Sequence, residues 1–376
     1  MRPFSGDNQK TTMAASKELA SMARARSLVV RGYYGNGNCG DEALLATLLQ
    51  YFSPAYRFIV SVNDAGRVAA NLKKKKIGAY ADVKVVWSLD RGVVTRGDVA
   101  GFLLGGGGLG LGFGWDQYMF AWRKGKKIIH AGVHVTEEYV SPTPDAFNDV
   151  TRALLGSAHF FSVRHRLSVE TAARLGVRAA YVPDWAFALK TEPGPTPGRD
   201  YVVVTIRADA HQRNPHTLRC LQSIAAYAEA EGLDIVLLPF DISDQRLTKR
   251  LKVAGQMLGG LFYRPAYVKH LIAHAKVAFS LGRYHPIVFA MASDVPIFSV
   301  DAVRRGRSDD KTCLQLIEEG LDDFHFPIDR LDDFTPAEIG RLVRRYAVSG
   351  TYSKSFMNNA ALVDAAAGRI HEILKS

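Results

Sequence analysis

The chain has 376 residues, 47% of them hydrophobic and 23% charged, which is ordinary for a globular protein and argues against a disordered or fibrous one. No apolar run approaches the ~20 residues of a membrane-spanning helix, and the first 26 residues lack the apolar core of a signal peptide. Three cysteines (Cys39, Cys220 and Cys313) lack metal-ligand spacing and cannot all pair, which favours reduced thiols. We therefore expect a cytoplasmic protein that holds no metal.

The formal net charge of +11 favours anionic partners. Much of it comes from two basic clusters at residues 73–76 and 123–127. Their simplest interpretation is solvated surface. The functional alternative is peripheral contact with an anionic membrane or with a diphosphate-linked carrier, at the inner face of the membrane. No recognisable nucleic-acid-binding module surrounds these charges, so nucleic acid is not expected as a partner.

Short β-rich runs alternate with longer helical stretches, a pattern typical of α/β domains with mostly parallel sheets. Residues 1–26 are polar and are predicted to be a disordered leader. Residues 42–52 carry leucines at helical spacing and are predicted to form a helix. The strands predicted for an N-terminal α/β domain, residues 27–192, are residues 27–31, 57–62, 83–87, 99–104, 127–133 and 159–163.

Residues 191–198 are dense in proline and glycine and are the best linker candidate in the chain. The alternation then restarts, which predicts a C-terminal α/β domain over residues 199–350. Residues 351–376 are predicted to be a helix that packs back across the domain boundary. Paired α/β domains commonly bind ligands in the crevice at the carboxyl ends of their strands. The elements expected after the linker are strands at 201–206, 233–238 and 277–280 and helices at 215–231, 244–258, 286–292 and 336–348.

The loop after the first strand contains G-x-G-x-x-G at Gly35, Gly37 and Gly40, and Asp64 follows the second strand. This arrangement suggests a dinucleotide site, with Asp64 as the acid that binds the ribose. Two features weigh against that interpretation. The glycines begin several residues after the strand, and the acidic pair that follows Gly40 would repel a pyrophosphate at the helix N-terminus.

The polar residues of this loop, Asn38, Asp41 and Glu42, better suit hydrogen bonds to the hydroxyls of a sugar acceptor. Simple capping of the helix by Asn38 and Asp41 is the alternative. A second loop, residues 105–108, has four successive glycines directly after a buried-looking strand. Gly106 and Gly107 would allow a ligand to approach the backbone closely, although a mobile turn would look the same.

A third motif follows the apolar run 277–279, where Arg283 and His285 precede a short helix-like stretch. Pro286 suits the first helical turn, whose free N–H groups and dipole attract anions. Arg283 adds a permanent charge, and His285 adds a group that exchanges protons near neutral pH. The helix N-terminus and Arg283 should both lower the pKa of His285 and keep its imidazole neutral. A surface arginine and a capping histidine are the structural alternative.

Together these segments resemble the polysaccharide pyruvyltransferase family. Residues 32–45 look like its signature G-Y-x-G-x-x-N-x-G-D-E-A-hydrophobic. Residues 162–177 are similar to its S-V-R-x-x-x-S…L-G-V block, with Pro183 and Asp184 after it. Residues 104–108, 204–207 and 283–285 match its glycine run, an arginine-terminated strand and its arginine–hydrophobic–histidine motif. The resemblance runs in order from residue 28 to residue 300.

The chain departs from the family pattern at two places. His165 stands where the family usually has an acid, and residues 131–134, which end in His134, replace a Q-G-I-G-like segment. These departures concern the detail of the binding sites more than the fold.

The resemblance implies two Rossmann-like domains facing a cleft, as in glycosyltransferase-B enzymes. It also implies transfer of a pyruvyl group from phosphoenolpyruvate to a sugar of a cell-surface or exopolysaccharide precursor, with formation of a ketal. Phosphoenolpyruvate is then a co-substrate, and neither a metal nor a nucleotide cofactor is implied. The acceptor could be lipid-diphosphate-linked, and the oligomeric state does not follow from the sequence.

Three arginines, Arg164, Arg207 and Arg283, fall at predicted strand ends and suit the phosphate and carboxylate of this donor. One or two of them could instead form structural ion pairs with nearby acids. With Gly106, Gly107 and His285 they make up the expected donor site. His285 and Arg283 are the expected catalytic residues, because a histidine can carry protons in both directions.

Two other functions fit the same sequence. A nucleotide-sugar-dependent glycosyltransferase could have this paired-domain architecture, since a fold does not fix the chemistry. A saccharide-binding module without catalytic activity is the second alternative.

Overall fold

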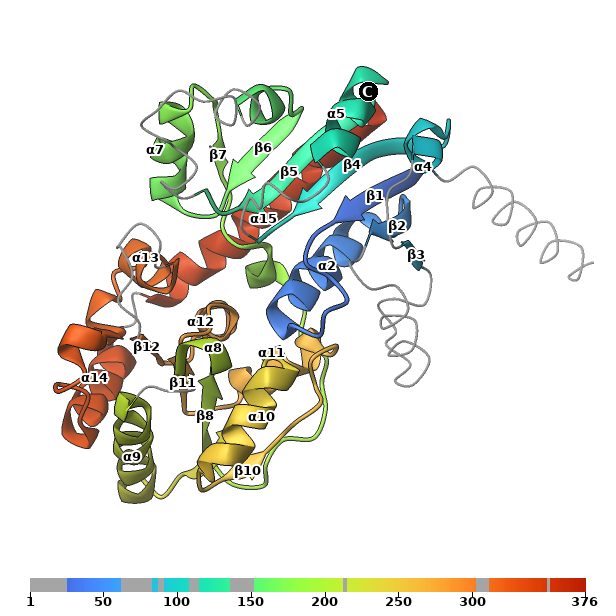
Figure 1. Ribbon diagram of the computed structural model, residues 1–376. Coiled ribbons are helices and arrows are strands. Elements are labelled where there is room, and N and C mark those ends of the chain that lie inside the picture. The colour runs from blue at the N-terminus through green and yellow to red at the C-terminus, as the bar shows by residue number, and fades with distance from the viewer. Residues whose placement is uncertain are drawn as a thin grey trace, which may run out of the picture.

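The computed structural model describes residues 26–61, 83–86, 91–107, 115–135, 152–211, 215–301, 311–349 and 352–376. These residues form two separate parallel sheets with helices packed on them (Figure 1). Residues 1–25 of the predicted leader, Asp64, the basic run 73–76 and Gly108 lie outside the described residues.

The first sheet has seven strands in the order β3-β2-β1-β4-β5-β6-β7. Each of the six strands predicted for this half is confirmed to within one residue at either end. The strands are β1 (Ser27–Arg31), β2 (Arg57–Ser61), β3 (Val83–Val86), β4 (Val99–Gly105), β5 (Lys127–Val133), β6 (Phe160–Val163) and β7 (Ala180–Tyr181). The helices are α2 (Cys39–Phe52), α4 (Arg91–Thr95), α5 (Trp115–Arg123), α7 (Arg166–Arg174) and the 3₁₀ helix η3 (Trp185–Ala188).

The second sheet has six strands in the order β10-β9-β8-β11-β12-β13. Its strands are β8 (Tyr201–Ile206), β9 (Asp234–Leu237), β10 (Gln256–Met257), β11 (Val277–Leu281), β12 (Ile297–Asp301) and β13 (His325–Pro327). Its helices are α8 (Ala208–His211), α9 (Pro215–Ala230), α10 (Ile242–Leu251), α11 (Pro265–Ala273), α12 (His285–Met291), α13 (Lys311–Glu318) and α14 (Pro336–Ser349). Two 3₁₀ turns, η4 (Asp322–Phe324) and η5 (Ile328–Arg330), complete it.

The helix predicted over residues 244–258 is wrong beyond residue 251. Helix α10 ends at Leu251, where Lys252 takes a left-handed conformation with a φ of 49°. Gly255, with a φ of 136°, then allows the chain to turn so that β10 pairs with β9. The apolar residues after Lys252 have helical spacing, but they pack against the sheet as an edge strand and its flanking loop.

Both sheets reverse their strand order near the middle, between β1 and β4 in the first and between β8 and β11 in the second. Such switch points open a space at the carboxyl ends of parallel strands, where ligands bind in α/β folds. In the second sheet Leu281 of β11 lies opposite Ile206 of β8, so the residues that follow these two strands emerge side by side.

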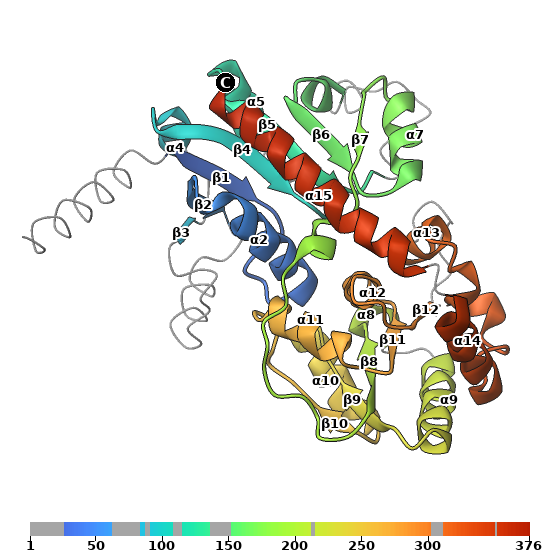
Figure 2. The ribbon, with the colours of Figure 1, turned by 180° about the vertical axis from the view of Figure 1, so that it is seen from behind.

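Helix α15 (Tyr352–Lys375) runs from the second half of the molecule across to the first sheet (Figure 2). At one end Asn359 donates to Glu319, which directly follows α13, over 2.7 Å. At the other end Arg26 donates to the carbonyl of Leu374 over 2.8 Å. One apolar cluster extends from the first sheet through Trp185 of η3 into the second sheet, so the two halves share a continuous core.

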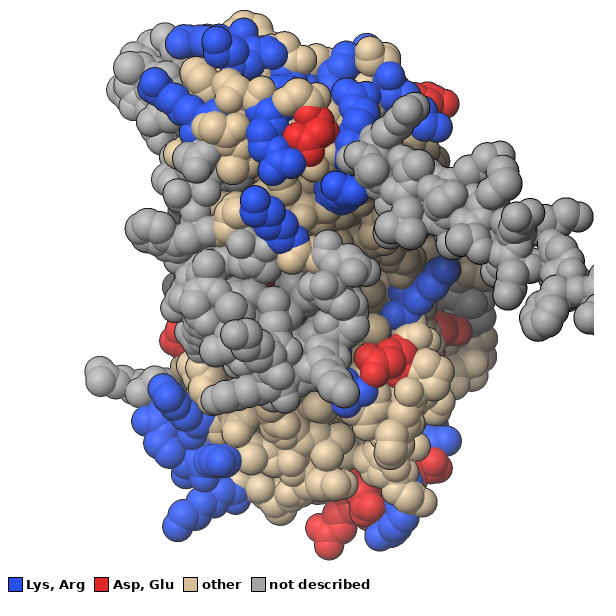
Figure 3. Space-filling view, turned by 90° about the vertical axis from the view of Figure 1, so that its right-hand side faces the viewer, with Lys and Arg blue, Asp and Glu red and all other residues tan. Residues whose placement is uncertain are grey.

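A basic face lies on the first half of the molecule, at the top of Figure 3. In the same half of the chain Arg91 and Lys124 both lie over the ring of Phe120, and Lys126 donates to the carbonyl of Arg96 over 2.8 Å. Part of the predicted basic cluster 123–127 therefore supports the local fold through its contacts. Across the described ranges, no helix combines the length and the apolar character needed to cross a membrane.

Candidate functional site

Three buried polar side chains meet where the two halves of the molecule adjoin. Arg164 follows β6, Asp184 precedes η3, and His285 begins α12 after β11. Nη1 of Arg164 donates to Oδ2 of Asp184 over 2.9 Å, and Nε2 of His285 lies 3.7 Å from the same oxygen. The other oxygen of Asp184 accepts the backbone N–H of Ala186 over 3.0 Å, which fixes the carboxylate.

The imidazole of His285 packs directly against the first glycine loop. A Cβ atom added to Gly40 would lie 1.9 Å from Nδ1 of His285, so only glycine fits between helix α2 and this ring. Asn38 caps α2 by accepting the N–H of Gly40 over 3.1 Å. The backbone N–H of Cys39 donates to the carbonyl of Phe240 over 2.8 Å, which ties the same loop to the second sheet.

His285 is neutral in this structure. Its pKa is lowered to about 3, first by burial and then by the positive charges of Arg164, Lys311 and Arg283, while Asp184 acts in the opposite direction. A neutral imidazole is also the prediction from the sequence, where the helix N-terminus and Arg283 are its two expected causes. Burial is the larger cause, because the ring is enclosed between the two halves of the molecule.

Lys311, the first residue of α13, is a cation of this site that the sequence analysis does not identify. Its Nζ lies 5.7 Å from the ring centroid of Tyr284, and Cζ of Arg164 lies 4.6 Å from the same centroid. Asp41 is half-buried and lies close enough to Lys311 and Arg164 for their positive charges to act on its carboxyl group. Burial raises its pKa to about 6, and the charges of Lys311, Arg164 and Arg283 act against that rise.

Two histidines from the ends of β5 and β6 extend the site. The rings of His134 and His165 meet edge to face with centroids 5.1 Å apart, and His165 meets the ring of Tyr284 at 5.7 Å. Within the described part of the chain, three ring nitrogens have no hydrogen-bond partner: both nitrogens of His165 and Nε2 of His134. Burial is the main cause that lowers the pKa of both, to about 2 for His134.

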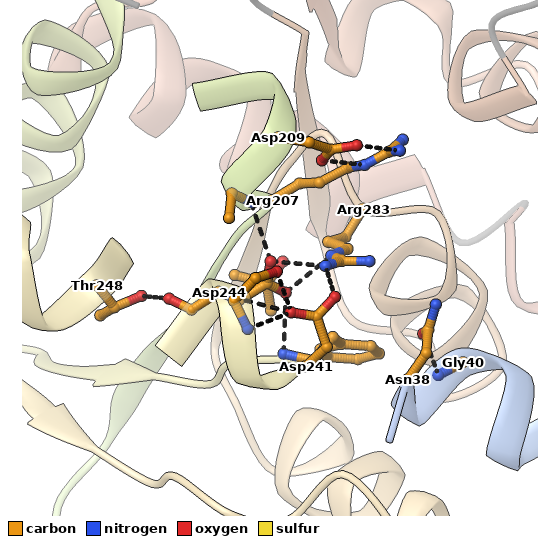
Figure 4. A network of polar contacts seen from close by, with 12 residues as sticks. Asn38, Gly40, Arg207, Asp209, Asp241, Asp244, Thr248 and Arg283 are labelled. Carbon is orange, nitrogen blue, oxygen red and sulfur yellow. Dashed lines mark hydrogen bonds and ion pairs between the residues drawn. The ribbon is translucent and has the colours of Figure 1, made fainter. Parts of the chain in front are cut away.

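Arg283 is held by acids of its own half of the molecule (Figure 4). Its Nε donates to Oδ2 of Asp244 over 2.8 Å, its Nη2 donates to Oδ1 of Asp244 over 2.6 Å, and it also pairs with Asp241. Asp244 in turn accepts the backbone N–H of Ala208 over 2.9 Å. The guanidinium therefore joins the loops that follow β8, β9 and β11.

Arg207 forms a separate pair beside this cluster. Its Nε and Nη2 both donate to Asp209 over 2.6 Å. The structure thus brings Arg164 to His285, while Arg207 and Arg283 meet carboxylates of the second half.

The model of the polysaccharide pyruvyl transferase family matches residues 38–302 of this chain. The chain belongs to the polysaccharide pyruvyl transferase family. The match includes every residue of the Arg164–Asp184–His285 site and identifies the protein as a transferase of the polysaccharide pyruvylation type. No curated protein matches the chain in sequence.

Solved structures show the same fold at low identity. UDP-GlcNAc 2-epimerase from Neisseria meningitidis, bound to UDP-GlcNAc, has a TM-score of 0.58 at 10% identity, covering 93% of this chain and 99% of that one. The glycotransferase of kitacinnamycin has a TM-score of 0.56 at 13% identity, with coverage of 93% and 99%. The spinosyn rhamnosyltransferase SpnG has a TM-score of 0.54 at 11% identity, with coverage of 93% and 99%. This pyruvyl transferase family member therefore has a glycosyltransferase-B-like α/β fold.

The remaining predicted residues shape the loops of the family member. Glu42 is fully buried and accepts the N–H of Gly35 over 2.8 Å, which holds the first glycine loop in place. Gly106 and Gly107 both have left-handed φ angles, of 69° and 80°. The N–H of Gly106 donates to Ala131 over 2.8 Å, so this run connects β4 to the end of β5.

Sequence reasoning assigned no role to Asp184, Lys311 or Tyr284. The sequence could have indicated Asp184 as a site residue, because it belongs to the Pro-Asp pair of the family resemblance. No sequence motif indicates Lys311, because it reaches the site only through the position of α13. No group of three or more His, Cys, Asp or Glu among the described residues is arranged to hold a metal ion.

Proposed function

We propose that this protein transfers a pyruvyl group from phosphoenolpyruvate to a saccharide of a cell-surface or exopolysaccharide precursor, forming a ketal and releasing phosphate. The observation that carries the proposal is the meeting of Arg164, Lys311 and a neutral His285 at one buried place between the two halves. An enzyme that acts on a phosphorylated carboxylate needs positive charges to bind its phosphate and carboxylate groups, and a proton acceptor for the reaction.

Phosphoenolpyruvate would bind through its two anionic groups. Nε of Arg164 is buried and has no hydrogen-bond partner among the described residues, so this guanidinium retains donor capacity beyond its pair with Asp184. Lys311 adds a second positive charge close by. A charge-assisted hydrogen bond from such a group contributes ~1.5–3 kcal/mol, and a buried setting weakens screening by salt.

The chemistry needs two proton transfers, for which His285 is the proposed carrier. One sugar hydroxyl adds to C2 of the donor, and its proton goes to the methylene carbon, which becomes the methyl group. The C2–O bond to phosphate then breaks, a second hydroxyl attacks C2, and the second hydroxyl proton leaves with the phosphate. A neutral imidazole can accept the hydroxyl proton, and the carboxylate of Asp184, 3.7 Å away, favours the imidazolium that forms.

The acceptor would meet the first glycine loop. Asp41 is the half-buried acid of that loop, and its carboxylate suits hydrogen bonds to sugar hydroxyls better than contact with an anionic donor. Asn38 and Glu42 would act by shaping the loop, through the cap on Gly40 and the bond to Gly35. No metal or nucleotide cofactor enters this reaction.

Ligand-induced thermal stabilisation tests the proposal. We expect phosphoenolpyruvate to raise the melting temperature, and UDP- and GDP-sugars to leave it unchanged. Phosphate release from phosphoenolpyruvate in the presence of a panel of saccharide acceptors then tests turnover. Stabilisation by a nucleotide sugar and not by phosphoenolpyruvate would point to a glycosyltransferase, and stabilisation by neither would point to a binding module.

A further inference from the structure

His165 occupies an unusual position for a histidine. It follows Arg164 directly, its side chain has no solvent exposure, and neither ring nitrogen has a hydrogen-bond partner among the described residues. Its ring meets Tyr284 edge to face, with centroids 5.7 Å apart. A buried imidazole without partners is costly, which makes such a group a candidate for contact with a ligand.

A carboxylate from the other half of the molecule faces this ring. Oε1 of Glu318, in α13, lies 4.0 Å from Nδ1 of His165 and accepts the backbone N–H of Arg166 over 2.6 Å. The side chain of Glu318 is 9% exposed, and a hydrogen bond from Tyr181 also reaches it. His165 therefore lies close to Glu318 and in the field of the positive charges of Arg164 and Lys311.

The charged and titratable groups that face His165 come from four elements. They are Arg164 after β6, His134 after β5, Tyr284 before α12, and Lys311 and Glu318 of α13. Tyr181 of β7 contacts Glu318. Burial lowers the pKa of His165 well below its usual value, and His134, Arg164 and Lys311 lower it further. A dianion placed against Arg164 and Lys311 would offset that repulsion. Burial raises the pKa of Glu318 to about 7, so above that pH its carboxylate would stabilise an imidazolium.

We propose that His165, supported by Glu318, takes up a proton when a phosphoryl dianion binds beside Arg164, and that this pair makes the site prefer phosphoryl groups to carboxylates. The inference rests on the proposed function for the identity of the donor. It adds a proton-linked phosphoryl site made from a histidine at a position where the family resemblance predicts an acid. The imidazolium also pairs with Glu318, so a bound phosphoryl group strengthens a contact between the two halves.

Isothermal titration calorimetry in buffers of different ionisation enthalpy measures this proton uptake. The ligands are phosphoenolpyruvate, inorganic phosphate and pyruvate. At pH 8, where Glu318 is ionised, we expect the wild type to take up about one proton more than His165→Gln with phosphoenolpyruvate and with phosphate, and no difference between the two proteins with pyruvate. The second pKa of a phosphate monoester lies near 6, and the comparison between the two proteins removes that contribution.

The pH dependence gives an independent readout. When one proton is taken up on binding, the dissociation constant rises by about tenfold for each unit of pH. The slope for phosphoenolpyruvate between pH 7.5 and 8.5, above the pKa of Glu318, should therefore be smaller in His165→Gln than in the wild type. His274→Gln, at an exposed residue of the second half, is the matched control and should keep the wild-type slope.

Glu318→Gln is the second variant and keeps an acceptor for the N–H of Arg166. Glu318→Gln should reduce the proton uptake as well. Should His165→Gln fail to fold, the result for Glu318→Gln becomes the deciding test. Proton uptake that is unchanged in a folded His165→Gln would overturn the inference. If His165→Gln is unfolded, unchanged proton uptake in Glu318→Gln would overturn it instead. In either case the proposed function still stands if phosphoenolpyruvate binds. Uptake that depends on His165 with phosphate, in a protein that does not bind phosphoenolpyruvate, would support the phosphoryl site and overturn the proposed donor.

Discussion

Arg164 and Arg283 both follow the carboxyl end of a parallel strand, yet their guanidinium groups have opposite surroundings. Arg164 meets one carboxylate, that of Asp184, and its Nε has no partner among the described residues. Arg283 meets two carboxylates, those of Asp241 and Asp244. One guanidinium against one carboxylate, with Lys311 nearby, attracts an anion, whereas one guanidinium against two carboxylates does not.

The number of acids around an arginine thus decides what its guanidinium can bind. Arg283 belongs to the arginine–hydrophobic–histidine motif, and its place in that motif suggests donor contact. In the fold its guanidinium connects three loops of the second half, and one of these loops carries Phe240, whose carbonyl accepts the N–H of Cys39. Arg283 thus supports the glycine loop that packs on His285, while Arg164 stands beside the imidazole itself.

The largest effect is expected at His285, the proton carrier of the Arg164 site. His285→Gln should lower turnover by at least ~10²-fold, the low end for general acid–base catalysis, and should leave much of the affinity for phosphoenolpyruvate. Phosphate release with a saccharide acceptor measures the first quantity and calorimetry the second. His274→Gln is the control, and near-wild-type turnover in His285→Gln would mean that the histidine only begins a helix.

Gly40→Ala should have the next largest effect, through the same imidazole. The added methyl group would lie 1.9 Å from Nδ1 of His285 and must displace the ring. A misplacement of ~1 Å can reduce catalysis roughly 10²-fold. Gly97→Ala is the matched control, because a Cβ atom there meets no other atom within 4 Å. Equal turnover in both variants would show that the position of the ring does not matter.

Arg164→Lys should weaken the binding of phosphoenolpyruvate about ten- to a hundredfold, because a charge-assisted bond contributes ~1.5–3 kcal/mol and each decade corresponds to 1.4 kcal/mol. Lysine keeps the positive charge opposite Asp184 but lacks the forked guanidinium, which can donate two parallel hydrogen bonds. The control is Arg199→Lys, at a residue whose side chain is 70% exposed. A folded Arg164→Lys with wild-type affinity would remove Arg164 from the donor site.

Arg283→Lys should change donor affinity less than Arg164→Lys and stability more. Loss of the fork that holds Asp244 should lower the melting temperature by on the order of 5 °C, given ~1–3 kcal/mol for the lost bonds and ~2–4 °C per kcal/mol. Calorimetry and thermal unfolding on the same samples separate the two effects. A donor affinity reduced as far as in Arg164→Lys would place Arg283 at the donor after all.

The smallest effect concerns pH and Glu318. Burial raises the pKa of Glu318 from 4.5 to about 7, so the folded state holds this proton more tightly than the unfolded state. The resulting stabilisation is complete below pH 4.5 and is lost as the pH rises towards 7. Glu318→Gln lacks this dependence. Its melting temperature relative to the wild type should therefore rise from pH 4.5 to 7.5, and a constant difference across this range would contradict the assignment.

Local sequence determined the framework of this protein. The strands 27–31 and 127–133 were predicted with their observed bounds, because continuous apolar runs bounded by polar turns leave few alternatives for a buried parallel strand. Helix α12 was also predicted, from Pro286 and the apolar stretch after it. The prediction failed at residues 252–258, where the backbone of Lys252 and Gly255 decides between helix and strand.

The glycine loops and the arginine–hydrophobic–histidine motif also pointed to the family before any coordinates, because they lie in order along the chain. Only the tertiary structure decided how these motifs meet. Asp184, Lys311 and Glu318 reach the site from separate elements, and nothing in their local sequence indicates that approach. Charge and burial depend on neighbours that are distant in the chain. The same physical reason explains why Arg283 is held by two acids, why Glu42 faces inward to Gly35, and why His165 lies without a partner among the described residues beside Arg164.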